Sequence, residues 1–464
     1  MAEMRVARRN PFLEGNFAPW RDEGDFQNLP VRGRLPAELQ GTYYRNGPNP
    51  AFDPIGRYHW FDGDGMVHAV RIGAGRAAYS NRWVRSKGLL EEFRAGRALY
   101  YGLLELGRSE GGYKNTANTN VLFHASRFFA LMEAGLPTEL DPVTLVTLRE
   151  YDFGGRLRGP MTAHPKIDPR SGELLFFGYS PVAPFLTFYR ADPKGNLVST
   201  EAIPGRMPAM VHDFAITEHY AVFFVCPLMF RLENMGSERP VFSWEPSQGM
   251  LWGVLPRNSG GDQIQWLECE PCFIFHAMNA YERGNTIVVD VVRYPYMELE
   301  QLEQRAEELA DNAATLWRFT LETKIGRVWG EKHASVSCEF PRIDERMTGQ
   351  RYRYGFMVAR SPNAPATEGL PKFTALAKCD WQTGRTELRD FGPHVGVGEA
   401  VFVPRGATVR EGDGYLLALI YDELRDTSEL HVLSVEGFLD EPLAVVELPH
   451  RVPYGFHGAW VPGI

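Results

Sequence analysis

The chain has 464 residues, of which 44% are hydrophobic and 23% are charged, and its formal net charge is −9. This composition supplies enough apolar side chains for a large core and excludes an intrinsically disordered chain. Because acidic residues are in excess and Lys and Arg form no basic stripe, nucleic acid is not expected as a partner.

Five cysteines are too few for a disulfide framework, which suits a reducing compartment. The basic residues near the start of the sequence are not followed by the apolar segment of a secretory signal. The chain also contains no apolar run of about 18 residues, the length that spans a membrane. These features predict a cytoplasmic protein and leave a peripheral membrane contact open.

In the first half of the chain, residues Gly88–Gly107 are rich in Leu, Glu, Ala and Arg and predict a helix. Its apolar side chains could cover a hydrophobic cavity, touch a membrane or pack against the body of the protein. Short apolar and aromatic runs typical of strands follow it. Three of these runs are Leu174–Tyr179, Phe185–Tyr189 and Tyr220–Cys226.

The second half continues this pattern with an expected strand at Thr286–Val292. A second helix is predicted over Met297–Trp317, which is again rich in Leu, Glu and Ala. Further strands are expected at Tyr415–Tyr421 and Glu429–Val435. Asp, Pro and Gly separate the runs, as in the turn sequence Asp192–Gly195.

The predicted strands run through the chain without a Pro- or Ser-rich linker or a shift in composition. Closed and radial all-β folds accommodate such a length because they protect the edges of their strands. A sandwich rarely needs so many strands, whereas a β-propeller does. The sequence therefore favours an all-β fold of the propeller type, although no repeat of 40 to 50 residues is visible.

Four histidines occur in similar strand-like surroundings beside small residues, and they are far apart in the sequence. In a radial fold, residues of different blades can converge on the axis, where neutral imidazoles suit Fe, Zn, Cu or Ni. Taken singly, each histidine would be a buried, hydrogen-bonded core residue. The four are His164, His212, His276 and His457.

Five motifs follow one another along the chain, from residue 46 to residue 460. This ordered set resembles the carotenoid cleavage oxygenase family, and the resemblance extends from about Leu29 to Pro462. It implies a seven-bladed β-propeller with a partly helical dome over an axial iron site. It also implies that residues 29–464 form a single catalytic propeller domain after an N-terminal extension of residues 1–28. The motifs are Asn46–Pro50, Tyr58–Met66, Thr162–Lys166, Val211–Phe214 and His457–Trp460.

The resemblance further implies that the four histidines bind Fe(II) as the cofactor. Three glutamates would accept the other ring N–H groups, which fixes the tautomers and raises ligand basicity. Four neutral ligands leave the ion its full 2+ charge and leave positions for O₂, unlike a site of two histidines and one carboxylate. The metal ligands would be His164, His212, His276 and His457, and the glutamates would be Glu133, Glu339 and Glu399.

Thr119 matches the family position whose side chain crowds one vacant coordination position. There it would orient O₂ and restrict water, and the alternative is a threonine that faces its neighbouring strand. Aromatic side chains are candidates for packing against a polyene or an aryl ring. They are Trp60, Phe61, Phe185, Phe275 and Trp460.

By this resemblance the protein is a non-haem Fe(II)-dependent dioxygenase that cleaves a C=C bond of a carotenoid or apocarotenoid to two carbonyl products. Its partners would be O₂ and an apolar or aromatic alkene, and the sequence leaves the oligomeric state undefined. An alternative is cleavage of a stilbene or of a phenylpropene such as isoeugenol. Relatives of that type carry Lys directly before the first glutamate, where this chain has Met132, but Tyr354–Met357 also resembles them. A non-catalytic binder of apolar ligands is a third alternative, disfavoured by the complete set of histidines and glutamates.

Overall fold

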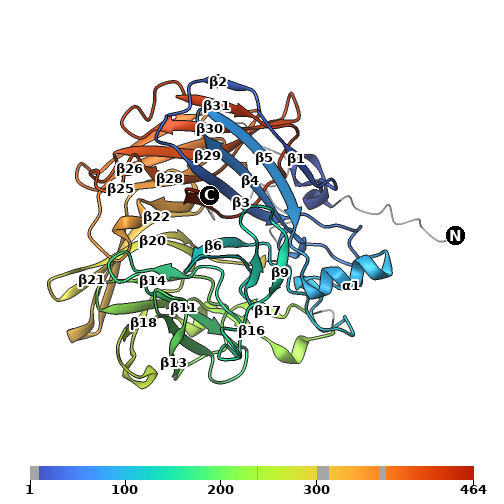
Figure 1. The fold of residues 1–464 in the computed structure, drawn as a ribbon. Helices are drawn as coiled ribbons and strands as arrows, with labels where there is room; N and C mark the ends of the chain where they lie inside the picture. The colour runs from blue at the N-terminus through green and yellow to red at the C-terminus, as the bar shows by residue number, and fades with distance from the viewer. Residues whose placement is uncertain (1–9, 238, 300–312, 365–371) are drawn as a thin grey trace.

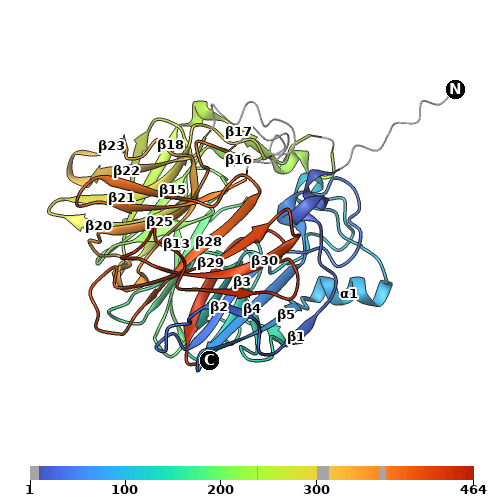
Figure 2. The ribbon, with the colours of Figure 1, turned by 90° about the horizontal axis from the view of Figure 1, so that it is seen from above.

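The computed structural model describes residues 10–237, 239–299, 313–364 and 372–464. Seven antiparallel sheets follow one another around a common centre (Figure 1), so the predicted seven-bladed β-propeller is confirmed. In Figure 1 the colours pass around the molecule from the blue β3 to β5, through green and yellow, to the orange and red β28 to β31 beside the starting point. In Figure 2 the molecule is turned by 90° from this view, and α1 lies at its periphery.

Two blades combine strands from opposite ends of the chain, and each of them closes the ring by pairing an N-terminal with a C-terminal strand. Strand β1 lies within the predicted N-terminal extension and pairs with β5, and the division of the chain at residue 28 stays a prediction. Blade 1 contains β1 (Gly24–Phe26), β5 (Arg76–Trp83), β4 (Gly65–Gly73), β3 (Gly41–Pro48) and β32 (Gly458–Pro462). Blade 7 contains β28 (Val395–Pro404), β29 (Gly414–Asp422), β30 (Thr427–Ser434), β31 (Ala444–Glu447) and β2 (Val31–Gly33).

The other five blades are four-stranded, with sequential strands from the inner to the outer edge. Blade 2 contains β6 (Asn120–His124), β7 (Arg127–Leu131), β8 (Thr138–Leu140) and β9 (Thr147–Glu150). Blade 3 contains β10 (Lys166–Ile167), β11 (Leu174–Tyr179), β12 (Leu186–Ala191) and β13 (Leu197–Ile203). Blade 4 contains β14 (Phe214–Ile216), β15 (Tyr220–Val225), β18 (Met250–Pro256) and β19 (Gln265–Cys269), and it carries a hairpin of β16 (Leu228–Phe230) and β17 (Phe242–Trp244).

Blades 5 and 6 complete the ring between blade 4 and blade 7. Blade 5 contains β20 (Phe273–Arg283), β21 (Thr286–Tyr294), β22 (Thr315–Glu322) and β23 (Arg327–Lys332). Blade 6 contains β24 (Cys338–Ile343), β25 (Tyr354–Ala359), β26 (Ala375–Asp380) and β27 (Arg385–Asp390).

The core lies between the blades, which explains why middle strands are apolar on both faces. In β11, all six residues are buried. Phe176 packs into one inter-blade cluster, and its neighbour Phe177 packs into another on the opposite face of the sheet. Since successive side chains of a strand point to opposite faces, a strand between two such clusters reads as a continuous apolar run.

The first predicted helix is much shorter in the structure than the sequence indicates. Helix α1 covers Lys87–Ala95 and is capped by Ser86, whose Oγ accepts a hydrogen bond from the Leu89 amide at 3.4 Å. It ends at Gly96, which takes a left-handed conformation with φ of 68°. The prediction of a continuous helix to Gly107 is therefore wrong, because this turn stops the helix. The buried Leu89 contacts the body of the propeller beside Met66 and Trp83.

The second predicted helix, Met297–Trp317, lies largely outside the described residues, which exclude 300–312. Its last part is wrong, because residues 315–317 belong to strand β22, between β21 and β23. No helix in the described ranges is long and apolar enough to cross a membrane. The remaining described helices are single 3₁₀ turns: η1 (Pro11–Leu13), η2 (Gly15–Phe17), η3 (Trp60–Asp62), η4 (Leu103–Glu105), η5 (Leu232–Asn234), η6 (Pro246–Gln248), η7 (Gly261–Gln263), η10 (Thr323–Ile325) and η11 (Glu345–Met347).

Candidate metal centre

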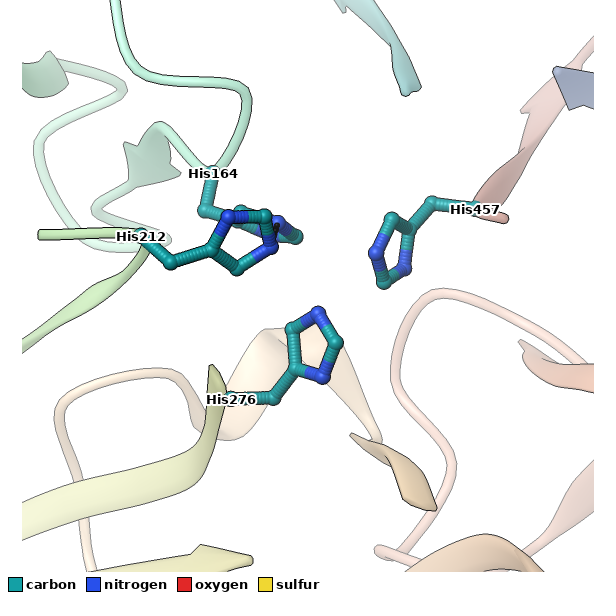
Figure 3. A group of neighbouring side chains, drawn as sticks. All are labelled: His164, His212, His276 and His457. Atoms are coloured by element: carbon teal, nitrogen blue, oxygen red, sulfur yellow. Dashed lines mark hydrogen bonds between the residues drawn. The ribbon is translucent and has the colours of Figure 1, made fainter. Parts of the chain in front are cut away.

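Four imidazoles meet at the centre of the ring, although they come from four different blades. Figure 3 shows His164, His212, His276 and His457 with their rings turned toward a common space. One ring nitrogen of each lies within 4.8 Å of the corresponding nitrogens of the other three. His164, His212 and His457 stand directly before or within two residues of β10, β14 and β32, and His276 lies inside β20. Inner strands of the propeller therefore deliver all four donors.

β-Bulges lie at three residues that face this centre. The pairing register of β20 shifts around His276, that of β24 shifts after Glu339, and that of β28 shifts around Glu399. A bulge leaves one residue out of the regular ladder and redirects its side chain. Local breaks in the inner strands thus aim these side chains at the axis.

Three of the four imidazoles are hydrogen-bonded to carboxylates through Nδ1. The bond from His276 to Glu339 measures 2.6 Å and that from His457 to Glu399 measures 2.8 Å, while His212 pairs with Glu133. Because a carboxylate accepts the bond, Nδ1 carries the proton and Nε2 presents its lone pair. The structure thus brings the three sequence-predicted glutamates together with the predicted histidines.

The arrangement of the Nε2 atoms fits one bound metal ion. Nε2 of His276 is buried and has no hydrogen-bond partner among the described residues. Nε2 of His164 lies 3.0 Å from Nε2 of His212, so two acceptor atoms face each other unless a cation or proton separates them. Ligand nitrogens about 2.1 Å from one ion lie about 3 to 4 Å apart, so an ion would draw the four nitrogens only slightly closer together.

Burial keeps two of the imidazoles neutral. It lowers the pKa of His457 to about 4 and, together with the neighbouring histidines, holds the pKa of His164 well below its usual range. Burial also disfavours the charged form of His276, but the adjacent charge of Glu339 outweighs it and raises the pKa of that imidazole. A carboxylate that stabilises a proton on an imidazole also makes it a more basic ligand.

Each of the three carboxylates also accepts a bond from a side chain behind it. These donors were not predicted from the sequence, because the bonds join residues distant along the chain. They are Tyr179 to Glu133 at 2.6 Å, Tyr294 to Glu339 at 3.0 Å and Arg342 to Glu399 at 3.2 Å.

Glu399 is the most deeply embedded of these carboxylates, with a side chain 1% exposed. Burial favours its neutral form, but the charge of Arg342 and the hydrogen bond from His457 outweigh burial and lower its pKa to about 2. Its Oε2 also accepts a hydrogen bond of 2.8 Å from the Gly458 amide. Glu399 is therefore a fixed anion behind His457.

Phe340 covers the side of the centre between two ligands. Its ring centroid lies 5.5 Å from that of His276 and 5.1 Å from that of His457. Its φ of 50° is in the left-handed region, which is an outlier for a bulky side chain. This conformation turns the Phe340 amide back onto Glu339, to which it donates a hydrogen bond. Such strained residues cluster at functional sites.

The structure places Thr119 beside the ligands, since its carbonyl oxygen accepts a 3.2 Å hydrogen bond from the His457 amide. Its hydroxyl donates to Asn118 at 3.0 Å. The predicted effect of Thr119 on a coordination position stays a prediction.

Of the five aromatic candidates, Phe275 lies against one of the four histidines and Phe61 lies behind Phe275. Phe275 packs on His212 with ring centroids 5.2 Å apart, and Phe61 packs on Phe275 at 6.3 Å. Trp60 lies one layer further out, against Phe456, which also contacts Phe61.

The other two aromatic candidates lie elsewhere. Phe185 lines a separate pocket with Met207 and Trp266. Trp460 packs into the core cluster of blades 1 and 7. Because strand residues alternate between faces, aromatic identity alone could not separate axial from inter-blade positions.

Comparison with known proteins gives matches over nearly the whole chain. The family described as "RPE65: Retinal pigment epithelial membrane protein" matches residues 17–462. The carotenoid 9,10(9′,10′)-cleavage dioxygenase 1 of Arabidopsis thaliana is 38% identical, and the alignment covers 97% of this chain and 89% of that relative.

Two solved structures extend this likeness to three dimensions. The lignostilbene dioxygenase of Pseudomonas brassicacearum has a TM-score of 0.93 and 32% identity, with 98% of this chain and 99% of that chain covered. The cobalt-substituted apocarotenoid oxygenase (ACO) of Synechocystis has a TM-score of 0.83 and 32% identity, covering 96% and 97% of the two chains. By its sequence, its fold and its four-histidine centre, the chain belongs to the RPE65 or carotenoid cleavage oxygenase family.

Proposed function

We propose that this member of the family is a non-haem Fe(II)-dependent dioxygenase that cleaves a C=C bond of a carotenoid or apocarotenoid to two carbonyl products. The observation that carries the proposal is the convergence of four imidazoles, three of them backed by carboxylates. Zinc has no redox chemistry, whereas imidazoles also suit iron. The relatives named as cleavage dioxygenases support an alkene-cleaving oxygenase.

In this proposal the histidines hold the ion, and the ion supplies the activation of O₂ when it is bound. Glu133, Glu339 and Glu399 hold the Nδ1 protons of their imidazoles and so keep Nε2 available. Phe61 and Phe275 provide an apolar wall that orients the alkene and excludes water. Thr119, beside His457, narrows the space next to the ligands.

A second candidate is the cleavage of a stilbene or phenylpropene. The high TM-score and almost complete coverage of the lignostilbene dioxygenase favour it. Met132, which lies directly before Glu133 and is 6% exposed, is evidence against this candidate. Its thioether cannot pair with a phenolate as an ammonium group would, so the position favours an apolar substrate.

The experiment uses protein loaded anaerobically with Fe(II) and then mixed with ¹⁸O₂ and apocarotenals, resveratrol or isoeugenol. We expect apocarotenals to be cleaved and both carbonyl products to carry label. A His276→Ala variant, which lacks one ligand, should bind little iron and form no product. Cleavage of the phenolic substrates alone would establish the second candidate. A wild-type protein that takes up no Fe(II) would exclude both.

A further inference from the structure

An ion pair with a buried carboxylate and a half-buried lysine lies immediately behind the histidines and has no part in the function described so far. Nζ of Lys166 is 2.7 Å from Oδ1 of Asp213, whose side chain is only 1% exposed, while that of Lys166 is 20% exposed. Burying such a pair is costly, and well-packed apolar residues often stabilise a fold equally well. The contacts of Asp213 indicate what the pair does instead.

Asp213 uses both carboxylate oxygens to connect backbone segments. Its Oδ2 accepts a 2.9 Å hydrogen bond from the Ala277 amide, at the bulge of β20. Its Oδ1 accepts a 2.8 Å hydrogen bond from the amide of its own neighbour, Phe214, besides the contact with Lys166. One carboxylate therefore joins β10, β14 and β20, the inner strands of three successive blades.

Each of the joined segments carries a histidine next to its contact. Lys166 follows His164 by two residues, Asp213 follows His212 directly, and Ala277 follows His276 directly. The fourth histidine is held separately, by Glu399 and by the contact of its amide with Thr119. The ion pair thus acts on three of the four donors.

His164 depends on such a link more than the other histidines. In the part of the chain that the structure describes, it has no carboxylate partner, whereas His212, His276 and His457 each have one. Its own amide donates a hydrogen bond to Thr162 Oγ1 at 3.0 Å, and that hydroxyl donates in turn to the His212 carbonyl at 3.3 Å. Lys166 adds an ionic link from this loop to Asp213 of the same neighbouring blade.

We propose that Lys166 and Asp213 are positioning residues that clamp the segments bearing His164, His212 and His276 at the spacing of one metal ion. The clamp rests on the proposed metal-binding function and adds residues that act through the ligands. Preorganised donors bind a metal more tightly because less conformational freedom is lost on binding.

The direct test is Asp213→Asn. Lys166 and the Ala277 amide bind different oxygens of the carboxylate, and an amide has an NH₂ group in place of one of them, so Asn cannot accept from both donors. We expect the dissociation constant for Fe(II), measured anaerobically by chelator competition, to rise at least about tenfold, as for other residues behind metal ligands. The visible spectrum of the Co(II)-loaded protein should change too, because the donors relax from their positions.

The matched control is Asp168→Asn. Asp168 also forms a buried ion pair between blades 3 and 4, with its Oδ2 2.7 Å from Arg257 and side chains 7% and 6% exposed. It lies directly after β10, and its hydrogen bonds and ion pairs within the described ranges involve none of the residues next to the histidines. We expect this variant to lose thermal stability as apo-protein while keeping the Fe(II) affinity and Co(II) spectrum of the wild type.

Lys166→Met is a second variant that tests the clamp if Asp213→Asn does not fold. It keeps the bond from Asp213 to Ala277 and frees only the loop of His164, so we expect a smaller loss of Fe(II) affinity than for Asp213→Asn. The clamp would be overturned if the Asp213 and Lys166 variants bound Fe(II) as tightly as wild type. It would also be overturned if Asp168→Asn lost as much Fe(II) affinity as Asp213→Asn. A wild-type protein that binds no Fe(II) would instead overturn the function on which the clamp rests.

Discussion

At the scale of single residues, Glu339 shows how one side chain can set the properties of a ligand. It accepts hydrogen bonds from His276, Tyr294 and the Phe340 amide, so both oxygens are occupied. We expect Glu339→Gln to fold normally and to lose about 10- to 100-fold in Fe(II) affinity or turnover, since a neutral amide makes the imidazole less basic. Chelator competition measures the Fe(II) affinity, and circular dichroism shows whether the variant is folded. The control is Glu331→Gln at an exposed position of β23. Equal Fe(II) affinities of the two variants would show that Glu339 does not tune the metal site.

Phe340 allows a prediction about backbone strain. Its φ of 50° should make Phe340→Ala less stable than Phe340→Gly, because only glycine takes this conformation without cost. The expected difference is about 1 kcal/mol, and it reverses the usual order of alanine and glycine in a strand. Thermal unfolding of the two variants at one scan rate measures it. An alanine variant that is the more stable of the two would show that the strain is absent.

The histidines and glutamates were predictable at this scale because short motifs carry them. The four histidines and Glu133, Glu339 and Glu399 indeed lie together. The donors behind the glutamates were not predictable. Tyr179 and Tyr294 look like ordinary core residues of apolar strands, and only the folded ring brings their hydroxyl groups to the carboxylates.

At the scale of elements, strands were easier to predict than helices. The run Leu174–Tyr179 coincides with β11, and Thr286–Val292 lies within β21. A strand that is buried between two blades has an apolar run of sequence bounded by turn residues, so such runs predict strands directly. The helical composition of Gly88–Gly107 continues past the end of α1, because composition does not reveal that Gly96 takes a left-handed conformation.

Gly96 can be tested against a second glycine with equal space around it. A Cβ atom added to Gly96 or to Gly73 would meet no atom within 4 Å, but only Gly96 has a positive φ, of 68°. Gly96→Ala should therefore cost about 1 kcal/mol and speed hydrogen exchange of the α1 amides about fivefold. Gly73→Ala, at the end of β4, should leave this exchange unchanged. Equal rates in the two variants would contradict a conformational stop at Gly96.

At the scale of the whole molecule, every blade supplies one of the seven residues at the centre. Blades 3, 4, 5 and 1 supply the histidines, and blades 2, 6 and 7 supply the glutamates. Blade 1 receives its histidine through β32, the last strand of the chain, and blade 7 receives β2 from near the start. The geometry of the centre therefore depends on the closure of the ring at both ends of the chain.

The closure of blade 7 includes a buried carboxylate. Glu429 on β30 is bonded to Arg32 on β2 at 3.0 Å, to Arg425 at 2.9 Å and to His431 at 3.0 Å. Its side chain is 7% exposed, whereas Glu447, which binds the same Arg32 from β31, is 40% exposed. The two glutamates therefore provide a matched pair for testing how closure depends on pH.

Hydrogen bonds from His431, Arg425 and Arg32 outweigh burial and lower the pKa of Glu429 from 4.5 to about 2. Because the folded pKa lies below the unfolded one, the stabilisation is complete above about pH 4.5 and is lost as the pH falls through about 2. At pH 7, Glu429→Gln should therefore unfold at a lower temperature than wild type. The expected loss in free energy of unfolding is only about 1 kcal/mol, because the arginines are half exposed. The difference should vanish toward pH 2. Glu447→Gln should stay close to wild type throughout, and a Glu429→Gln difference unchanged at low pH would show that this carboxylate does not hold the ring closed through its charge.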